Sequence, residues 1–207
     1  MGKTFPHTSL TMVVARYKEN ISWVPCLGYK FVIYNKGPKL GMPCIELPNI
    51  GREAHSYLYY IVSNYDKLTD FTAFLQGHPF DHCSNINCIF RDFPTSLDRL
   101  YKYCNGLYGI ADRFLEELDV DIHKIHVYPD VIYKEFFAVD YHKFHFAGGA
   151  QYIVHKNNIL NKPWQFYFDL LNYYSWTEHE PWSMERLWPQ IFDAEDKYKH
   201  KLKNLGK

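Results

Sequence analysis

The chain has 207 residues, which is long enough for one large domain with a substantial core. Basic and acidic residues balance at 23 each, so no charge bias points to nucleic acid or to a membrane surface. Five cysteines are scattered without a CxxC pair, which indicates a reducing compartment. No apolar run is long enough for a signal peptide or a membrane span, so we expect a cytoplasmic protein.

The first half of the chain alternates between strand and helix patterns. Apolar runs predict strands, and apolar residues at helical spacing predict a helix that starts at Glu53. The order is a strand (Leu10–Ala15), a short helix (Ile21–Val24), two strands (Tyr29–Tyr34, Cys44–Leu47), a helix (Glu53–Tyr65) and a strand (Phe71–Leu75). This order predicts right-handed crossovers and an α/β fold with a mainly parallel sheet.

The second half has weaker patterns and many aromatic residues. We predict helices at Thr95–Cys104, Asp112–Leu118, Trp164–Tyr174 and Met184–Phe192, and strands at Lys124–Val127, Val131–Val139 and Tyr152–Val154. Residues 177–182 are expected to form a polar loop, and residues 193–207 a charged tail. Nothing marks a second domain, so residues 1–192 are taken as one.

Polar loops follow three of the predicted strands, at Arg16–Asn20, Asn35–Gly37 and Gln76–His82. Because the carboxyl ends of parallel strands share one edge of a sheet, we expect these loops to lie together. The turn at Asn49–Glu53 should join them at a helix N-terminus, where free amides favour an anion and Arg52 adds a charged donor. The alternative for Arg52 is a surface salt bridge.

Two groups of side chains suggest chemistry. His78, Asp81 and His82 could bind a divalent cation beside a diphosphate, although Asp81 could equally cap a turn. In the C-terminal third, Glu185 lies near aromatic residues that could raise its pKa and suit it to act as a general base, with Glu178 and Glu180 as further candidates. The alternative for Glu185 is a solvated helix face.

Several segments resemble glycosyltransferases of the GT-A fold. VVARYKENISWV resembles the first strand and nucleotide loop of family-two-like enzymes, LPNIGREAHSYLYYIVSNYD resembles their turn into a helix, and FLQGHPFDH falls where they carry an Asp-x-Asp metal motif. FAGGAQYIVHKNNIL followed by PWSMERLWPQIF resembles their acceptor region and its acidic residue. The combination also resembles transferase-like proteins of fungi and a glycosyltransferase domain of large algal viruses.

The resemblance implies a Rossmann-like GT-A domain that transfers a sugar from a nucleotide sugar, such as a UDP-sugar, to a hydroxyl of a glycan or glycoprotein. It implies catalytic roles for Glu185 and Asp81 and a Mn²⁺ or Mg²⁺ ion held by Asp81 and His78. The donor would be bound by the following residues: Ala15, Arg16, Tyr17, Glu19, Asn35, Asn49, Arg52, Gln76, Gly77, His78, Gly148 and Gly149. A viral chain would act in the host cytoplasm.

The sequence departs from the family at the metal motif, where Gln76-Gly77-His78 occupies the expected Asp-x-Asp position. A non-catalytic module that binds a nucleotide sugar or a glycan therefore remains an alternative. A nucleotidyltransferase-like enzyme is a second alternative, but the sequence has no glycine-rich loop with a lysine that would cradle a triphosphate.

Overall fold

The computed structural model describes residues 9–93, 105–116, 127–137, 145–173 and 180–192. The strands are β1 (Leu10–Arg16), β2 (Lys30–Asn35), β3 (Ile45–Glu46), β4 (Phe71–Gln76), β5 (Leu107–Gly109), β6 (Phe114–Glu116), β7 (His145–Ala147) and β8 (Tyr152–His155). The helices are α1 (Trp23–Cys26), α2 (Arg52–Asn64), α4 (Pro129–Phe136), α5 (Lys156–Leu160), α6 (Trp164–Tyr173) and α7 (Glu180–Ile191), with 3-10 turns η1 (Tyr65–Lys67) and η2 (Pro79–Asp81). Residues 86–93 are also helical.

Six strands form the central sheet in the order β3-β2-β1-β4-β8-β5. The first four are parallel to one another, whereas β8 runs antiparallel to both β4 and β5. Strand β1 therefore lies between β2 and β4. The chain first adds β2 and β3 on one side of β1 and then places β4 on the other side. The predicted α/β fold with a mainly parallel, Rossmann-like sheet is confirmed.

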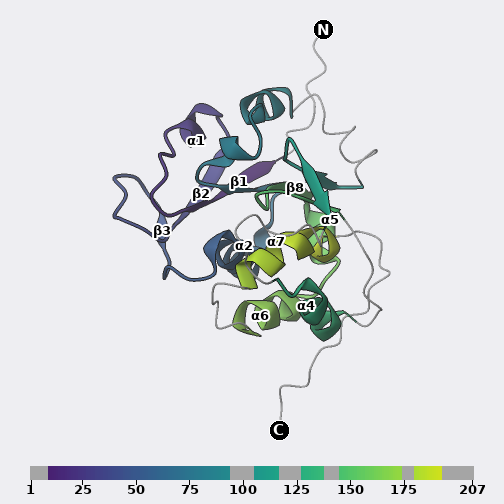
Figure 1. Ribbon diagram of the computed structural model, residues 1–207. Helices are drawn as coiled ribbons and strands as arrows, with labels where there is room; N and C mark the ends of the chain where they lie inside the picture. The colour runs from purple at the N-terminus through teal and green to yellow at the C-terminus, as the bar shows by residue number, and fades with distance from the viewer. Residues whose placement is uncertain (1–8, 94–104, 117–126, 138–144, 174–179, 193–207) are drawn as a thin grey trace.

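Helices cover both faces of this sheet (Figure 1). Alternate residues of β1 point to opposite faces, so Val13 packs in one core and Met12 and Val14 pack in the other. The first core also contains residues of α2, α4, α6 and α7, and the second contains residues of α1 and of the helical segment 86–93. Both faces of β1 are therefore buried, which explains why this strand is an almost continuous apolar run.

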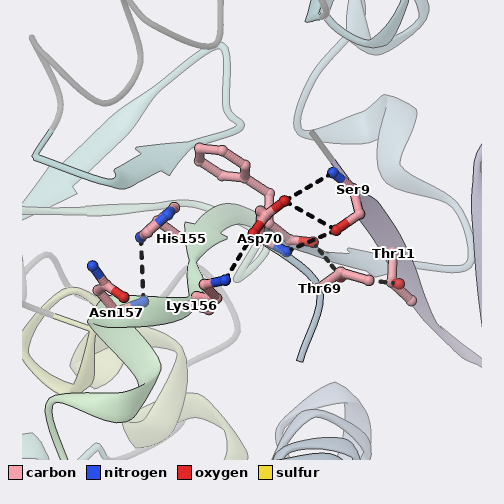
Figure 2. Close-up of polar contacts among 8 residues, drawn as sticks. Ser9, Thr11, Thr69, Asp70, His155, Lys156 and Asn157 are labelled. Carbon is pink, nitrogen blue, oxygen red and sulfur yellow. Dashed lines mark hydrogen bonds and ion pairs between the residues drawn. The ribbon is translucent and has the colours of Figure 1, made fainter. Parts of the chain in front are cut away.

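Polar side chains lie at the amino edge of the sheet, where β1 and β4 begin (Figure 2). Asp70 accepts hydrogen bonds from the main chain and hydroxyl of Ser9 and from Lys156, which begins α5. Nearby, the Thr69 hydroxyl lies 3.0 Å from that of Thr11. We call Ser9, Thr11, Thr69, Asp70 and Lys156 the amino-edge cluster. Their side chains form hydrogen bonds with other residues of the cluster.

Two element predictions in the second half are wrong. The segment predicted as a strand from Val131 forms helix α4, which begins with proline in its first turn. Its buried residues Pro129, Ile132, Tyr133 and Phe136 recur at helical spacing and pack against the core that contains α7. The β-branched and aromatic content of this segment suggested a strand, but the spacing of its buried residues is helical.

The second wrong prediction is the helix at Asp112–Leu118, where the described part forms strand β6. Phe114 to Glu116 pair with β7 in an antiparallel two-stranded sheet. Such pairing with a distant segment overrides local propensity and cannot be seen in a short sequence window. The predicted helix at Thr95–Cys104, almost all of the strand at Lys124–Val127 and the tail at 193–207 lie outside the described residues.

Other differences are smaller. Helix α7 begins at Glu180, so the second half of the predicted loop 177–182 is helical, with Pro181 in its first turn. Strands β5 and β7 and the helical segment 86–93 had not been predicted. Within the part of the chain that the structure describes, no helix is both long and apolar enough to cross a membrane.

Candidate functional site

A cavity of about 480 Å³ opens at the carboxyl edge of the sheet. It is lined by the ends of β1 and β4, the residue after β2 and the turn into α2, with these residues: Ala15, Arg16, Tyr17, Glu19, Lys36, Asn49, Arg52, Glu53, Gln76, Gly77, His78 and Asp81. The register of the strands explains why these residues lie close together, because Ala15 pairs with Gln76 and Arg16 pairs with Asn35. The expectation that the loops after these strands lie together is confirmed.

The cavity lies where the strand order changes direction, since β1 leads to β2 on one side while β4 lies on the other. In open α/β sheets, ligands bind outside the carboxyl ends of the strands at such a point. The volume is also in the range of small-molecule sites. Position and size together identify the cavity as the candidate binding site.

Arg16 holds the loop after β1 in place. Its guanidinium donates hydrogen bonds to the main-chain oxygens of Tyr17, Glu19 and Pro38 and, at 2.6 Å, to the side-chain oxygen of Asn35. The Asn35 side-chain amide donates in turn to main-chain oxygens and to Glu46. Asn35 is fully buried and does not line the cavity, so both residues are engaged within the protein.

Two glycines let the neighbouring loops approach the loop after β1. A Cβ added to Gly37 would lie 1.7 Å from the main-chain oxygen of Tyr17, and one added to Gly77 would lie 2.8 Å from the Glu19 carboxylate. That carboxylate also accepts hydrogen bonds from the main-chain N–H groups of Tyr17 and Lys18. The absence of side chains at these two glycines therefore sets the shape of the cavity wall.

The turn into α2 has consecutive left-handed residues, Gly51 at φ 61° and Arg52 at φ 44°. Such a conformation is unfavourable for arginine and persists only where the surroundings hold it. Lys36 supplies that support, because its ammonium donates to the main-chain oxygens of Ile50, at 2.5 Å, and of Arg52. The N-cap residue Gly51 makes no side-chain capping bond to α2, whose N-terminus lies at the cavity.

Two charged residues of the cavity, Lys36 and Glu53, are buried. Burial lowers the pKa of Lys36 to about 7, although the nearby Glu53 carboxylate opposes this shift. Burial also raises the pKa of Glu53; Arg52 and Lys36 oppose the rise, and Glu185 adds to it. For both groups, the loss of hydration outweighs the mutual attraction of the two charges.

The end of β4 carries the two residues predicted to bind a metal. The Nε2 of His78 lies 3.4 Å from the Oδ1 of Asp81, and both side chains are at least half exposed. Among the residues the structure describes, no group of three or more His, Cys, Asp or Glu side chains could hold a metal ion. These two side chains could therefore contribute only part of a coordination shell, and a bound ligand would have to supply the rest.

Of the predicted residues in the C-terminal half, Gly148, Gly149, Glu180 and Glu185 do not line the cavity, and Glu178 lies outside the described residues. Gly149 has a φ of 84° and packs so closely on His82 that an added Cβ would lie 2.5 Å from its ring. The Gly149 N–H donates to the Glu185 carboxylate at 2.6 Å. The turn at Gly148 and Gly149 therefore links the end of β4 to α7.

Sequence reasoning placed Lys36 and Glu53 in loops expected at this edge but named neither as a binding residue. Lys36 directly follows β2, and Glu53 lies next to Arg52, so the strand-end argument covered the positions of both. Their burial, however, depends on tertiary packing that a sequence pattern does not show.

A family model described as "Protein of unknown function (DUF3431)" matches residues 12–101. The match covers less than half of the chain, but it includes every residue that lines the cavity. No curated protein and no solved structure matches the chain. The chain is thus similar over its first half to this family, and the similar segment carries the cavity.

Proposed function

We propose that this protein is a glycosyltransferase that transfers a sugar from a nucleotide sugar, with a UDP-sugar as donor, to a hydroxyl of a glycan or glycoprotein. The observation that carries the proposal is the cavity across the carboxyl ends of β1 and β4. The resemblance of the loops that form it to those of GT-A enzymes supports the choice of ligand. We also propose that the protein acts in the cytoplasm.

The two ends of the donor would meet different groups. Tyr17 is 41% exposed at the cavity, so its ring offers a surface on which a planar base could stack. Arg52 lines the cavity with a side chain that is 56% exposed, next to the N-terminus of α2. A guanidinium at a helix N-terminus suits a diphosphate.

His78 and Asp81 would hold the Mn²⁺ or Mg²⁺ ion, with the remaining ligands coming from diphosphate oxygens. When bound, such an ion supplies stabilisation of the negative charge on the leaving diphosphate. The proposal for this chain is limited to these two side chains, because the described residues offer no larger group.

Glu185 would act as the general base of a direct displacement. The acceptor oxygen would form a bond to the anomeric carbon, the bond from that carbon to the diphosphate would break, and the acceptor proton would pass to Glu185. The hydrogen bond from Gly149 orients the carboxylate, and Trp182 of the same helix packs against Arg52 at 4.6 Å, which brings α7 to the cavity. These contacts support Glu185 as the general base.

A non-catalytic module that binds the same ligand is the second candidate. It is favoured by the sequence Gln76-Gly77-His78, which lacks the acidic pair at the position expected for the metal. Such a protein would bind UDP and would release none from a UDP-sugar.

The test combines binding with turnover. Calorimetry should show tighter binding of UDP than of GDP or CMP, and tighter binding with Mn²⁺ than with EDTA. UDP release from a panel of UDP-sugars then separates an enzyme from a binding module. Equal UDP affinity in Mn²⁺ and EDTA would remove the metal from the mechanism, and failure of every nucleotide to bind would refute the proposal.

A further inference from the structure

Lys36 occupies a corner of the cavity between the end of β2 and the first turn of α2. The residue is only 8% exposed, and its ammonium donates to the main-chain oxygens of Ile50 and Arg52. An ammonium has three N–H donors, so these two bonds leave one donor in a residue that lines the cavity.

The charged groups around Lys36 compensate its charge only in part. Glu53 is the carboxylate that acts on it, but Glu53 is itself buried and faces the like charge of Glu185 from α7. Arg52 adds a positive charge in the same turn, and His55, whose pKa burial and Lys36 lower to about 4, adds none near neutral pH. A buried cation with incomplete compensation attracts an anion that enters its cavity.

We propose that the ammonium of Lys36 contacts the anionic group of the ligand in this corner of the cavity. The inference rests on the proposed nucleotide-sugar site and deepens it, because the anion there would be the diphosphate. It assigns the diphosphate contact to a buried lysine in addition to the exposed Arg52.

Binding of the anion should be accompanied by protonation of the Lys36 amine. Burial holds the pKa of Lys36 near 7, so at pH 8 most of the free protein carries a neutral amine. A bound anion favours the charged form and raises that pKa, so binding at pH 8 takes up as much as about one proton from solution. An anion also raises the pKa of Glu53, and that contribution has to be measured separately.

The experiment is calorimetry at pH 8 in two buffers of different ionisation enthalpy, with UDP and with inorganic pyrophosphate as probes. Lys36→Arg keeps a positive charge that does not titrate, so its difference from wild type removes any proton exchanged by the probe itself. Lys36→Met removes the charge, Glu53→Gln removes the carboxylate, and Lys67→Met, an exposed lysine beyond the far end of α2, is the matched control.

We expect wild type, Glu53→Gln and Lys67→Met to take up protons with the probe and Lys36→Arg to lose this uptake while still binding. Lys36→Met should weaken binding about tenfold or more, as expected for loss of a hydrogen bond from a charged donor. A purely structural role for Lys36 could lower affinity, but it would leave proton uptake in Lys36→Arg unchanged. Uptake in Lys36→Arg that equals the uptake in wild type would therefore overturn the inference.

The two probes separate this inference from the proposed function. Lys36-dependent proton uptake with pyrophosphate supports the inference even if UDP binds no tighter than other nucleotides, a result that would refute only the nucleotide assignment. Tight UDP binding that is independent of Lys36 would refute the inference and leave the proposed function standing. If neither probe binds wild type, both are refuted.

Discussion

The two edges of the central sheet hold their charged side chains in different ways. At the amino edge, the charges of Asp70 and Lys156 meet directly at 2.8 Å, and Ser9 supplies further donors (Figure 2). At the carboxyl edge, Arg16 and Lys36 donate mainly to main-chain oxygens, and a cavity remains between the loops. Polar groups that satisfy one another stabilise the amino edge, whereas the groups held by main-chain oxygens at the carboxyl edge shape a cavity that a ligand can enter.

This comparison makes a general prediction about substitutions. Changes at the amino edge should alter stability and leave ligand binding intact, whereas changes around the cavity should alter binding or transfer. The four predictions below test it, from the largest expected effect to the smallest.

Glu185→Gln should lower sugar transfer by about 10²–10⁴-fold, the usual contribution of a general base, with UDP affinity nearly unchanged. Glutamine keeps an oxygen that can accept the hydrogen bond from Gly149, so the melting temperature should change little. Turnover per folded molecule and UDP affinity are measured on one preparation, with Asp130→Asn on α4 as the control. Unchanged turnover together with a lower melting temperature would show a structural role.

Gly37→Ala should destabilise the protein by about 1–3 kcal/mol and weaken UDP binding, because the new Cβ would overlap the main-chain oxygen of Tyr17. Gly41→Ala is the matched control, since no described heavy atom lies within 4 Å of its added Cβ. Thermal melting with and without UDP measures both effects. Equal melting temperatures for the two variants would show that the cavity wall does not depend on this close approach.

Asn35→Ala should cost about 1–2 kcal/mol, because it leaves the Arg16 guanidinium and two main-chain oxygens with fewer partners. Asn35 itself does not line the cavity, so any loss of UDP affinity should be indirect. It should arise because the loop after β1 is displaced. Urea denaturation gives the stability change, and calorimetry gives the affinity. A loss of affinity without a loss of stability would assign Asn35 a direct contact with the ligand.

Lys156→Met should have the smallest effect, about 0.2–1 kcal/mol, because its pair with Asp70 is partly exposed. The hydrogen bond from Lys156, with one from Ser9, lowers the pKa of Asp70 below its usual value. This contribution to stability is present above the unfolded pKa of aspartate and is lost as the pH falls through the folded value.

The stability difference between wild type and Lys156→Met should therefore be visible near pH 7 and should shrink below about pH 3. Urea denaturation across this pH range measures it, and UDP affinity serves as the second readout. A loss of UDP affinity in Lys156→Met would contradict the division of roles between the two edges.

The sequence was sufficient where local patterns carry the information. The apolar runs at β1, β2 and β4 had to be buried strands, and the polar residues after them had to lie at one edge once the strands were parallel. The helical spacing in α2 was equally clear. These elements account for the loops that form the cavity.

Tertiary structure decided what depends on contacts between distant segments. Strand β6 forms because β7 pairs with it, and α4 is a helix because its buried residues face α7. The side chains of Arg16 and Asn35 lie at the predicted edge, yet hydrogen bonds within the protein occupy them. A sequence pattern locates a polar side chain but does not show which partner it binds.

By itself, the sequence determined the α/β class, the parallel direction of the first four strands and the edge at which the polar loops gather. It could do so because hydrophobic periodicity and the order of elements along the chain can be read directly from the sequence. Only the tertiary structure decided that Lys36 and Glu53 are buried in the cavity and that Glu185 lies beside it. The physical reason is that burial of a charge depends on everything packed around it, and its neighbours come from β2, α2 and α7, which are far apart in the chain.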